Sequence, residues 1–209
     1  TNSGGTVVAR GGDSWSADTW AQQGVSITVT LGTLTISQDT SYAPSSQSYT
    51  VGTTQNTLNA FKFSTGAYEG VRITQVKLHA TGSAASSDSN VSNVSLYATD
   101  GTLLAGPAGM VSGVVTFGSY TTGLDATGLF DIAKSSNKTI LVKADIPSGA
   151  TATGTASSTY SAIGFEILTP NTTIKADGLS SQNDLATTDI TPSTTLPSTQ
   201  LIHTLLSQG

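Results

Sequence analysis

Few side chains in this sequence could carry out acid–base or nucleophilic catalysis. The chain of 209 residues has two histidines, His79 and His203, two glutamates, Glu69 and Glu166, and no cysteine. A Ser-His-Asp hydrolase needs a histidine beside its nucleophile, but His79 ends a predicted strand and His203 lies in the terminal tail. We therefore expect both to be surface or packing residues. A glycosidase needs two carboxylates, yet Glu69 falls in a predicted turn and Glu166 on the outward face of a strand, so we predict that the protein is not an enzyme.

Few residues are candidates for a metal site or for a covalent cross-link. Asp88 and Asn90 place oxygen ligands at alternate positions of a Ser-rich loop, which suits a hard cation such as calcium; the alternative is an ordinary polar loop. The absence of cysteine excludes disulfides, thiolate metal sites and a cysteine nucleophile. Lys62, a candidate for a Lys–Asn isopeptide bond of the Gram-positive pilin type, lies between Phe61 and Phe63 and should point away from the rings, toward solvent. We predict no cofactor.

Two groups of residues could carry or bind sugars. Asn-X-Ser/Thr triplets, the acceptors for N-glycosylation, begin at Asn90, Asn93, Asn137 and Asn171. Asn171 and Asn137 are better placed than Asn93, which opens a strand, although a chain rich in Ser and Thr produces such triplets by chance. Aromatic residues also cluster in the N-terminal quarter, where they could stack on sugars, anchor an interface, or hold the arm on its own domain: Trp15, Trp20, Tyr42 and Tyr49.

The composition is typical of an exported all-β protein. Only 10% of the residues are charged, and the chain has 22 glycines and many Ser and Thr residues. Thr and Val favour pleated strands, whereas Ser and Gly weaken helix interiors. Eight scattered Lys and Arg residues and a net charge of -5 give no basic stripe for a nucleic acid, and no run of 18 apolar residues could span a bilayer. We expect an extracellular or cell-surface location.

Alternating apolar residues predict a series of short strands. In the first, residues 25–31, one face carries Val25, Ile27, Val29 and Leu31. The next apolar positions are out of phase with this face, so we expect a bulge, a turn or a crossing between sheets at Gly32. Further strands are predicted at 58–64, 71–80, 94–99, 111–117, 139–146 and 163–168, with Asp100-Gly101 as a hairpin turn.

These strands predict a two-sheet, immunoglobulin-like β-sandwich. Phase breaks within 58–63 and within 71–80 indicate bulges or strands that change sheet. We expect the sandwich over residues 32–170, between an N-terminal arm (1–31) and a Ser/Thr/Pro-rich C-terminal arm (171–209). Two segments, 126–133 and 200–207, could form short helices.

Four motifs in the region from about residue 32 to 168 resemble a known module. They are Leu58-Asn59-Ala60-Phe61-Lys62-Phe63; Val71-Arg72-Ile73-Thr74-Gln75-Val76-Lys77-Leu78; Asn93-Val94-Ser95-Leu96-Tyr97 with Asp100-Gly101-Thr102-Leu103-Leu104; and Lys138-Thr139-Ile140-Leu141-Val142-Lys143-Ala144-Asp145-Ile146-Pro147. They resemble an immunoglobulin-like module found in predicted cell-surface and filament proteins of small-genome candidate-phylum bacteria. The resemblance implies a sandwich fold and a surface setting, and it transfers no functional residue.

Assembly is the function that these features favour. A strand with one apolar face, such as Val25, Ile27, Val29 and Leu31, can complete the sheet of another copy, and a head-to-tail contact of this kind generates fibres. We therefore expect a pilus-like filament or surface lattice subunit whose partners are other copies of itself. The alternative is a surface adhesion or carbohydrate-binding module of a larger protein, with glycans as partners and the strand 25–31 in its own sheet.

Overall fold

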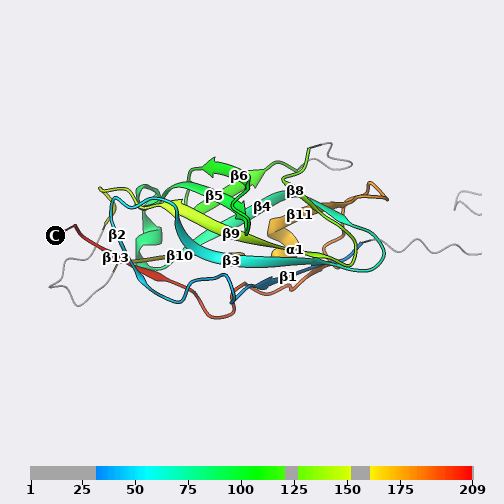
Figure 1. Ribbon diagram of the computed structural model, residues 1–209, viewed down its shortest axis with the longest axis horizontal. Helices are drawn as coiled ribbons and strands as arrows, with labels where there is room; N and C mark the ends of the chain where they lie inside the picture. Colours follow the sequence, from blue (N-terminus) through cyan, green and yellow to red (C-terminus); the bar gives the residue numbers. More distant parts are fainter. Residues whose placement is uncertain (1–31, 121–126, 152–160, 209) are drawn as a thin grey trace, which may run out of the picture. The chain divides into compact units, whose positions relative to one another are not determined.

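A computed structural model describes residues 32–120, 127–151 and 161–208 of the chain (Figure 1). These residues belong to one compact unit, Leu31–Gly209. The predicted strand at 25–31, with its apolar face of Val25, Ile27, Val29 and Leu31, lies outside the described residues, as do Trp15 and Trp20. All described strands and helices therefore belong to the domain that begins at Gly32.

Six strands form one sheet, in the order β12-β1-β3-β9-β5-β6, of which β1, β3, β9, β5 and β6 are labelled in Figure 1. Neighbours in this sheet run antiparallel except β1 and β12, which are parallel. The turn at Asp100-Gly101 joins β5 to β6 as the predicted hairpin. The strands are β1 (Leu34–Gln38), β3 (Asn56–Thr65), β5 (Ser92–Ala98), β6 (Leu103–Ala108), β9 (Asn137–Asp145) and β12 (Ile190–Thr191).

Seven strands form the second sheet, in the order β11-β4-β10-β13-β2, with β7 and β8 also paired to β4. The pair β2 and β13 is parallel. The strands are β2 (Ser48–Thr50), β4 (Val71–Thr81), β7 (Val114–Gly118), β8 (Phe130–Ile132), β10 (Ala162–Glu166), β11 (Ile174–Gly178) and β13 (His203–Leu206). The described helices are two 3-10 turns, Ser83–Ser86 and Asp88–Asn90, and α1 (Pro170–Thr173), and none of them has the length or apolar character of a membrane span.

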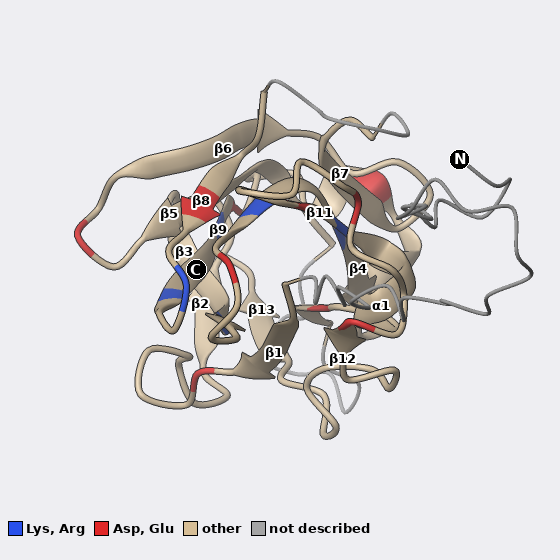
Figure 2. Ribbon diagram, turned by 90° about the vertical axis from the view of Figure 1, so that its right-hand side faces the viewer, with Lys and Arg blue, Asp and Glu red and all other residues tan. Residues whose placement is uncertain are grey.

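The two sheets face each other across a common apolar core, which confirms the predicted all-β sandwich. Figure 2 shows the strands of the two sheets from the end of the domain, with few charged residues along them. Fully buried side chains come from both sheets, among them Phe61 and Phe63 of β3 and Ile163 and Phe165 of β10. The immunoglobulin-like character of the sandwich stays a prediction.

Both predicted phase breaks are bulges. The pairing of β3 with β9 shifts register between Thr57 and Asn59, and the pairing of β11 with β4 shifts between Lys175 and Ala176. The first bulge buries the amide of Asn59, which links the sheets: Nδ2 donates to the Phe165 carbonyl at 2.8 Å, and Oδ1 accepts from the Ala60 amide at 2.8 Å. Both ends of this buried amide are thereby bonded, as burial requires.

The C-terminal segment, expected as an arm, is part of the sandwich. β11 pairs with β4, β12 with β1, and β13 with both β10 and β2. The side chains of His203 and Leu205 are fully buried. Residues 171–208 therefore complete the sandwich, which extends beyond the end expected at residue 170.

The two segments that the sequence allows as short helices form strands instead. The described part of 126–133 contains the strand β8, and 200–207 contains the strand β13. In each case the buried residues are two apart, Phe130 and Ile132 or His203 and Leu205, which is the period of a strand. The strand predicted at 111–117 begins later, at Val114, and Val111 is 72% exposed.

Candidate functional site

The two histidines are surface and packing residues, as predicted. His79 lies in β4 and is partly exposed. His203 is fully buried; its Nε2 lies 2.9 Å from the Leu58 carbonyl oxygen, its Nδ1 accepts the Gln47 amide at 3.4 Å, and its ring lies 5.2 Å from that of Tyr49. Burial lowers the pKa of His203, and the bond to Leu58 only partly offsets this effect. A neutral imidazole therefore joins β13 to β3 and to the chain before β2.

Glu69 is buried and holds two loops together, a role that the sequence does not reveal. Its carboxylate accepts the backbone amides of Gly32 at 2.9 Å, Ser180 at 3.0 Å and Ser181 at 2.9 Å, and the Ser181 hydroxyl at 3.0 Å. Burial raises the pKa of Glu69, but the bonds from Ser181, Gly32 and Ser180 outweigh it, so the pKa lies below its ordinary value. We call Glu69, Gly32, Ser180 and Ser181 the Glu69 clamp.

The clamp leaves no room for a larger residue at Gly178, because a Cβ atom there would collide with the Glu69 carboxylate.

The other glutamate, Glu166, is buried as well. The sequence predicts that Glu166 faces outward, but its side chain is only 9% exposed. All five residues of β10 are buried, because this strand is covered on both faces.

The candidate calcium ligands Asp88 and Asn90 bind backbone groups. The Asp88 carboxylate accepts the amides of Ser112 at 2.7 Å and Gly113 at 2.9 Å. The buried Asn90 side chain donates to the Ala84 carbonyl at 2.8 Å and accepts the Thr151 amide at 2.7 Å. Within the described ranges, no group of three or more His, Cys, Asp or Glu residues could hold a metal ion. These side chains fix loops in place.

The four candidate glycosylation sites differ in access. Asn90 is 2% exposed and bonded through both ends of its amide, so a glycosyltransferase cannot reach it in the folded protein. Asn93 is exposed and donates to Asp145 at 2.8 Å. Asn137 is exposed at the start of β9, and Asn171 is half-buried in α1. Modification of these last three sites stays a prediction.

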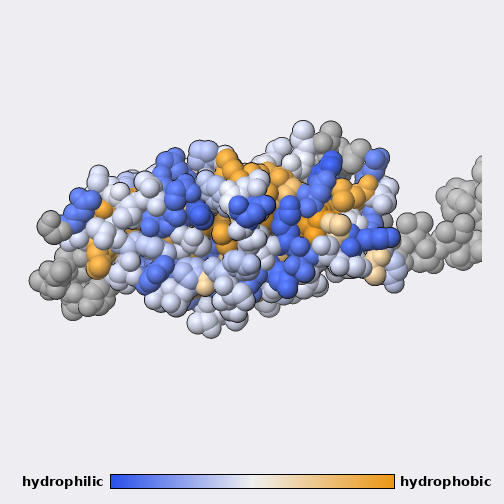
Figure 3. All heavy atoms as spheres, viewed as in Figure 1, coloured by the Kyte–Doolittle hydropathy of each residue, from blue (hydrophilic) through white to orange (hydrophobic). Residues whose placement is uncertain are grey.

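One surface feature lies beside β6, a terminal strand of the six-stranded sheet as described. It is a hollow of about 540 Å³ between β6 and β8, and we call it the β6–β8 hollow. Its lining combines the apolar side chains of Leu104, Leu129 and Phe130 with Arg72, Thr127, Gly128, Asp131 and Lys138. At its margin Arg72 and Asp131 form a two-bond ion pair, with Nε–Oδ1 at 2.8 Å and Nη2–Oδ2 at 3.0 Å. In Figure 3, hydrophobic side chains reach the surface in the middle of the molecular face shown in Figure 1.

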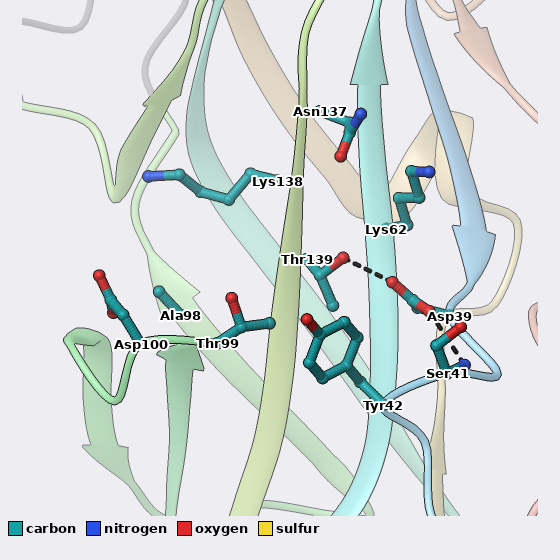
Figure 4. A pocket seen from close by; sticks show the side chains of 10 residues that line it. All are labelled: Asp39, Ser41, Tyr42, Lys62, Ala98, Thr99, Asp100, Asn137, Lys138 and Thr139. Atoms are coloured by element: carbon teal, nitrogen blue, oxygen red, sulfur yellow. Dashed lines mark hydrogen bonds between the residues drawn. The ribbon is translucent and has the colours of Figure 1, made fainter.

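A second feature, the Tyr42 hollow, lies on the outer face of the same sheet (Figure 4). It measures about 510 Å³. The Thr139 hydroxyl of β9 donates to Asp39 Oδ2 at 2.6 Å and so anchors the turn that carries Tyr42. Lys62 of β3 also lines the hollow and is partly exposed, as predicted. The lining residues are Asp39, Ser41, Tyr42, Lys62, Ala98, Thr99, Asp100, Asn137, Lys138 and Thr139.

The sequence indicates only parts of these features. Tyr42 belongs to the aromatic cluster of the N-terminal quarter, and it is 51% exposed; Tyr49, from the same cluster, packs on His203 and donates to the Thr57 carbonyl at 2.6 Å. Leu104 belongs to the predicted hairpin. No local pattern indicates that β6 is an edge strand, since that depends on the order of strands in the sheet.

Comparisons with known proteins identify no similar protein. The chain matches no protein-family model, no curated protein sequence and no solved structure. Its function must be inferred from the two surface features and from the residues that precede Gly32.

Proposed function

We propose that this protein is an extracellular structural subunit that assembles with other copies of itself by strand addition, into a pilus-like filament or a surface lattice. The observation that carries the proposal is the edge strand β6 beside the β6–β8 hollow. Strand addition satisfies a row of backbone groups on an edge strand and buries alternate side chains of the added strand. The domain offers the acceptor, and residues 25–31 have the pattern of a donor.

The acceptor edge has the required chemistry. Among the described strands, none pairs with the outer side of β6. Leu103 at its start is 48% exposed, and Leu104 lines the hollow together with Leu129 and Phe130. Pro107 has no amide proton, which closes the far end of β6 to pairing. An incoming strand would therefore pair along Leu103–Gly106 and place alternate side chains over the hollow.

The donor pattern is long enough for this edge, and its attachment favours a contact between copies. The four residues Leu103–Gly106 extend over roughly 13 Å, so a donor of seven residues, roughly 23 Å long, covers them with residues to spare. A donor ending at Leu31 is tethered to Gly32, two residues before β1. In the six-stranded sheet β1 is separated from β6 by β3, β9 and β5, or roughly 19 Å at the usual strand spacing. This separation favours a neighbouring copy as the source of the donor strand.

The test compares Ile27→Glu with Thr28→Glu in the full-length protein. Both changes add one negative charge to the same predicted strand, but the sequence pattern assigns Ile27 to its apolar face and Thr28 to its polar face. We expect Ile27→Glu to be monomeric by size-exclusion chromatography with light scattering, and Thr28→Glu to polymerise like the unmodified protein in electron micrographs. Equal assembly of the two variants, or polymerisation after deletion of residues 1–31, would contradict strand addition.

A mixing experiment tests the direction of the contact. Ile27→Glu removes the donor and leaves the acceptor, whereas Leu104→Lys places a charge in the β6–β8 hollow and leaves the donor. Each variant alone should be monomeric, and an equimolar mixture should form a dimer that grows no further. Polymerisation of Leu104→Lys on its own would show that β6 is not the acceptor, and a mixture that stays monomeric would contradict the complementation that strand addition requires.

The alternative is a surface adhesion or carbohydrate-binding module that works as a monomer. It predicts that the unmodified chain elutes as a single copy at all concentrations, so the same chromatography separates the two functions. The Tyr42 hollow is the feature of the domain that favours this alternative, because it combines an exposed aromatic ring with polar side chains.

A further inference from the structure

We infer that the Tyr42 hollow is a binding site for neutral hexose glycans. This site does not depend on strand exchange, because its residues come from the outer face of β3, β5 and β9 and from the adjoining loops. Figure 4 shows the Tyr42 ring standing beside Thr99 and Thr139, with Lys62 and Asp39 on one side and Asp100 on the other.

Tyr42 is an exposed ring on a fixed turn. Its side chain is 51% exposed, yet its backbone is held: the amides of Tyr42 and Ala43 donate to the Asp39 carbonyl at 3.1 and 2.7 Å, and the Ser41 amide donates to Asp39 Oδ1 at 3.1 Å. A tyrosine ring offers a rigid apolar surface at low entropic cost. The C–H face of a pyranose ring can stack on such a surface, which removes apolar area of both partners from water.

The groups around the ring match the hydroxyls of a sugar, each of which both donates and accepts. Because the Thr139 hydroxyl proton is committed to Asp39 at 2.6 Å, its oxygen is left to accept from a ligand. Lys62 supplies donors, and no carboxylate of the described residues lies within 4.0 Å of its ammonium group. Asn137 contributes an amide that both donates and accepts.

The charges of the lining favour a neutral ligand. Lys62 and Lys138 are balanced by Asp39 and Asp100. Hydrogen bonds from Thr102 are the main cause that holds the pKa of Asp100 below its ordinary value, so this carboxylate is ionised at neutral pH. An acidic sugar would meet these two carboxylates. The volume of about 510 Å³ lies within the range of small-ligand sites, roughly 300–1,000 Å³.

The test is isothermal titration of the full-length protein, produced without glycosylation so that Asn137 is unmodified. The probes are cellohexaose, maltohexaose and mannohexaose, with trigalacturonate as the acidic comparison. Tyr42→Ala should raise the Kd of the bound neutral glycan by about five- to tenfold, which is the loss expected for one aromatic stacking contact. Tyr42→Phe should retain binding, because the ring remains.

The matched control is Tyr68→Ala, which removes a tyrosine that is 66% exposed and lies outside the hollow. Its Kd should equal that of the unmodified protein. Thermal melting of Tyr42→Ala shows whether the variant is folded, and Tyr42→Phe supplies the same comparison without loss of packing. Absence of binding to all three neutral glycans, an unchanged Kd in Tyr42→Ala, an equal loss in Tyr68→Ala, or preference for trigalacturonate would each overturn the inference. Monomeric behaviour of the chain would bear on assembly and leave this inference untouched.

Discussion

Replacing Glu69 by alanine should destabilise the domain strongly, because one carboxylate bonds to two separate segments of the chain. The change removes the acceptor of three backbone amides and one hydroxyl. The Gly32 amide is buried, and an orphaned buried donor costs about 1–3 kcal/mol. The amides of Ser180 and Ser181 are partly buried and can regain water, so their loss costs about 0.5–1.5 kcal/mol each.

Together these losses predict a decrease of about 2–6 kcal/mol in the free energy of unfolding of Glu69→Ala. For a domain of this size, 1 kcal/mol corresponds to about 2–4 °C in Tm, so we expect Tm to fall by about 4–24 °C at pH 7. Glu166→Gln is the control, because it replaces the carboxyl group of the other buried glutamate by an amide of the same shape, and the Glu166 side chain accepts no hydrogen bond from the described residues. Its Tm should change by less than about 3 °C, the effect of roughly 1 kcal/mol.

The contribution of the Glu69 clamp to the stability of the domain should depend on pH. The folded-state pKa of Glu69 is lower than its ordinary value of 4.5, so the clamp contributes fully above pH 4.5 and loses its contribution as the pH falls through the folded-state pKa. The difference in Tm between the unmodified protein and Glu69→Ala, measured by circular dichroism, should therefore be large at pH 7 and smaller at about pH 3. A variant that melts within about 2 °C of the unmodified protein at pH 7, or a difference that is unchanged at the lower pH, would refute the role of the clamp.

Three further changes test the buried polar groups. The folded-state pKa of His203 lies below 6.5, so the free energy of unfolding of the unmodified protein should fall by up to about 1.4 kcal/mol per pH unit as the pH falls below 6.5. In urea titrations at several pH values, His203→Gln should show a weaker dependence on pH. Asn59→Ala should cost about 2–4 kcal/mol, since it orphans the Phe165 carbonyl and the Ala60 amide, and a Tm within about 2 °C of the unmodified protein would contradict this. Chelator should leave Tm unchanged, because the Asp88 oxygens already bind backbone amides; a fall in Tm would instead support a calcium site.

The parts of the fold that can be predicted from sequence are those with strong local patterns. Strands β3, β4, β5, β9 and β10 alternate apolar and polar residues or carry a continuous apolar run, and the turn Asp100-Gly101 determines the β5–β6 hairpin. The two bulges correspond to breaks in the same alternation, since a side chain keeps its face only while the period of two is maintained. Local pattern and final structure agree wherever a strand is long enough to show several periods.

The C-terminal strands could not be found in this way. β11, β12 and β13 have five, two and four residues. Unlike β10, which is also five residues long, they carry no continuous apolar run that would distinguish them from a background rich in Ser, Thr and Pro. Their pairing partners are far away in sequence: β12 pairs with β1, and β13 with β2 and β10. Such strands are stabilised by the sheet that they join, so their own residues carry little signal.

The candidate sites can likewise be predicted only in part from the sequence. Tyr42 is visible in the sequence as an aromatic residue in a polar segment, but its companions Lys62, Asn137 and Thr139 look like ordinary outward positions of strands. They converge because β3 and β9 are neighbours in register, with Lys62 opposite Thr139 and Ser64 opposite Asn137. The Glu69 clamp joins residues 111 positions apart, and no local signal distinguishes its glutamate from one in an exposed turn.

The clamp links the fold to the proposed assembly. Copies joined by residues 25–31 would transmit tension into the domain at Gly32, and the Gly32 amide is bonded to Glu69. Through Ser180 and Ser181 this carboxylate is attached to the loop that follows β11, while Gly32 itself leads into β1. Because β1 belongs to one sheet and β11 to the other, a load applied at Gly32 would be shared between both sheets instead of pulling β1 away from β3 and β12. A buried carboxylate at this position thus suits a subunit that carries force through its N-terminal segment.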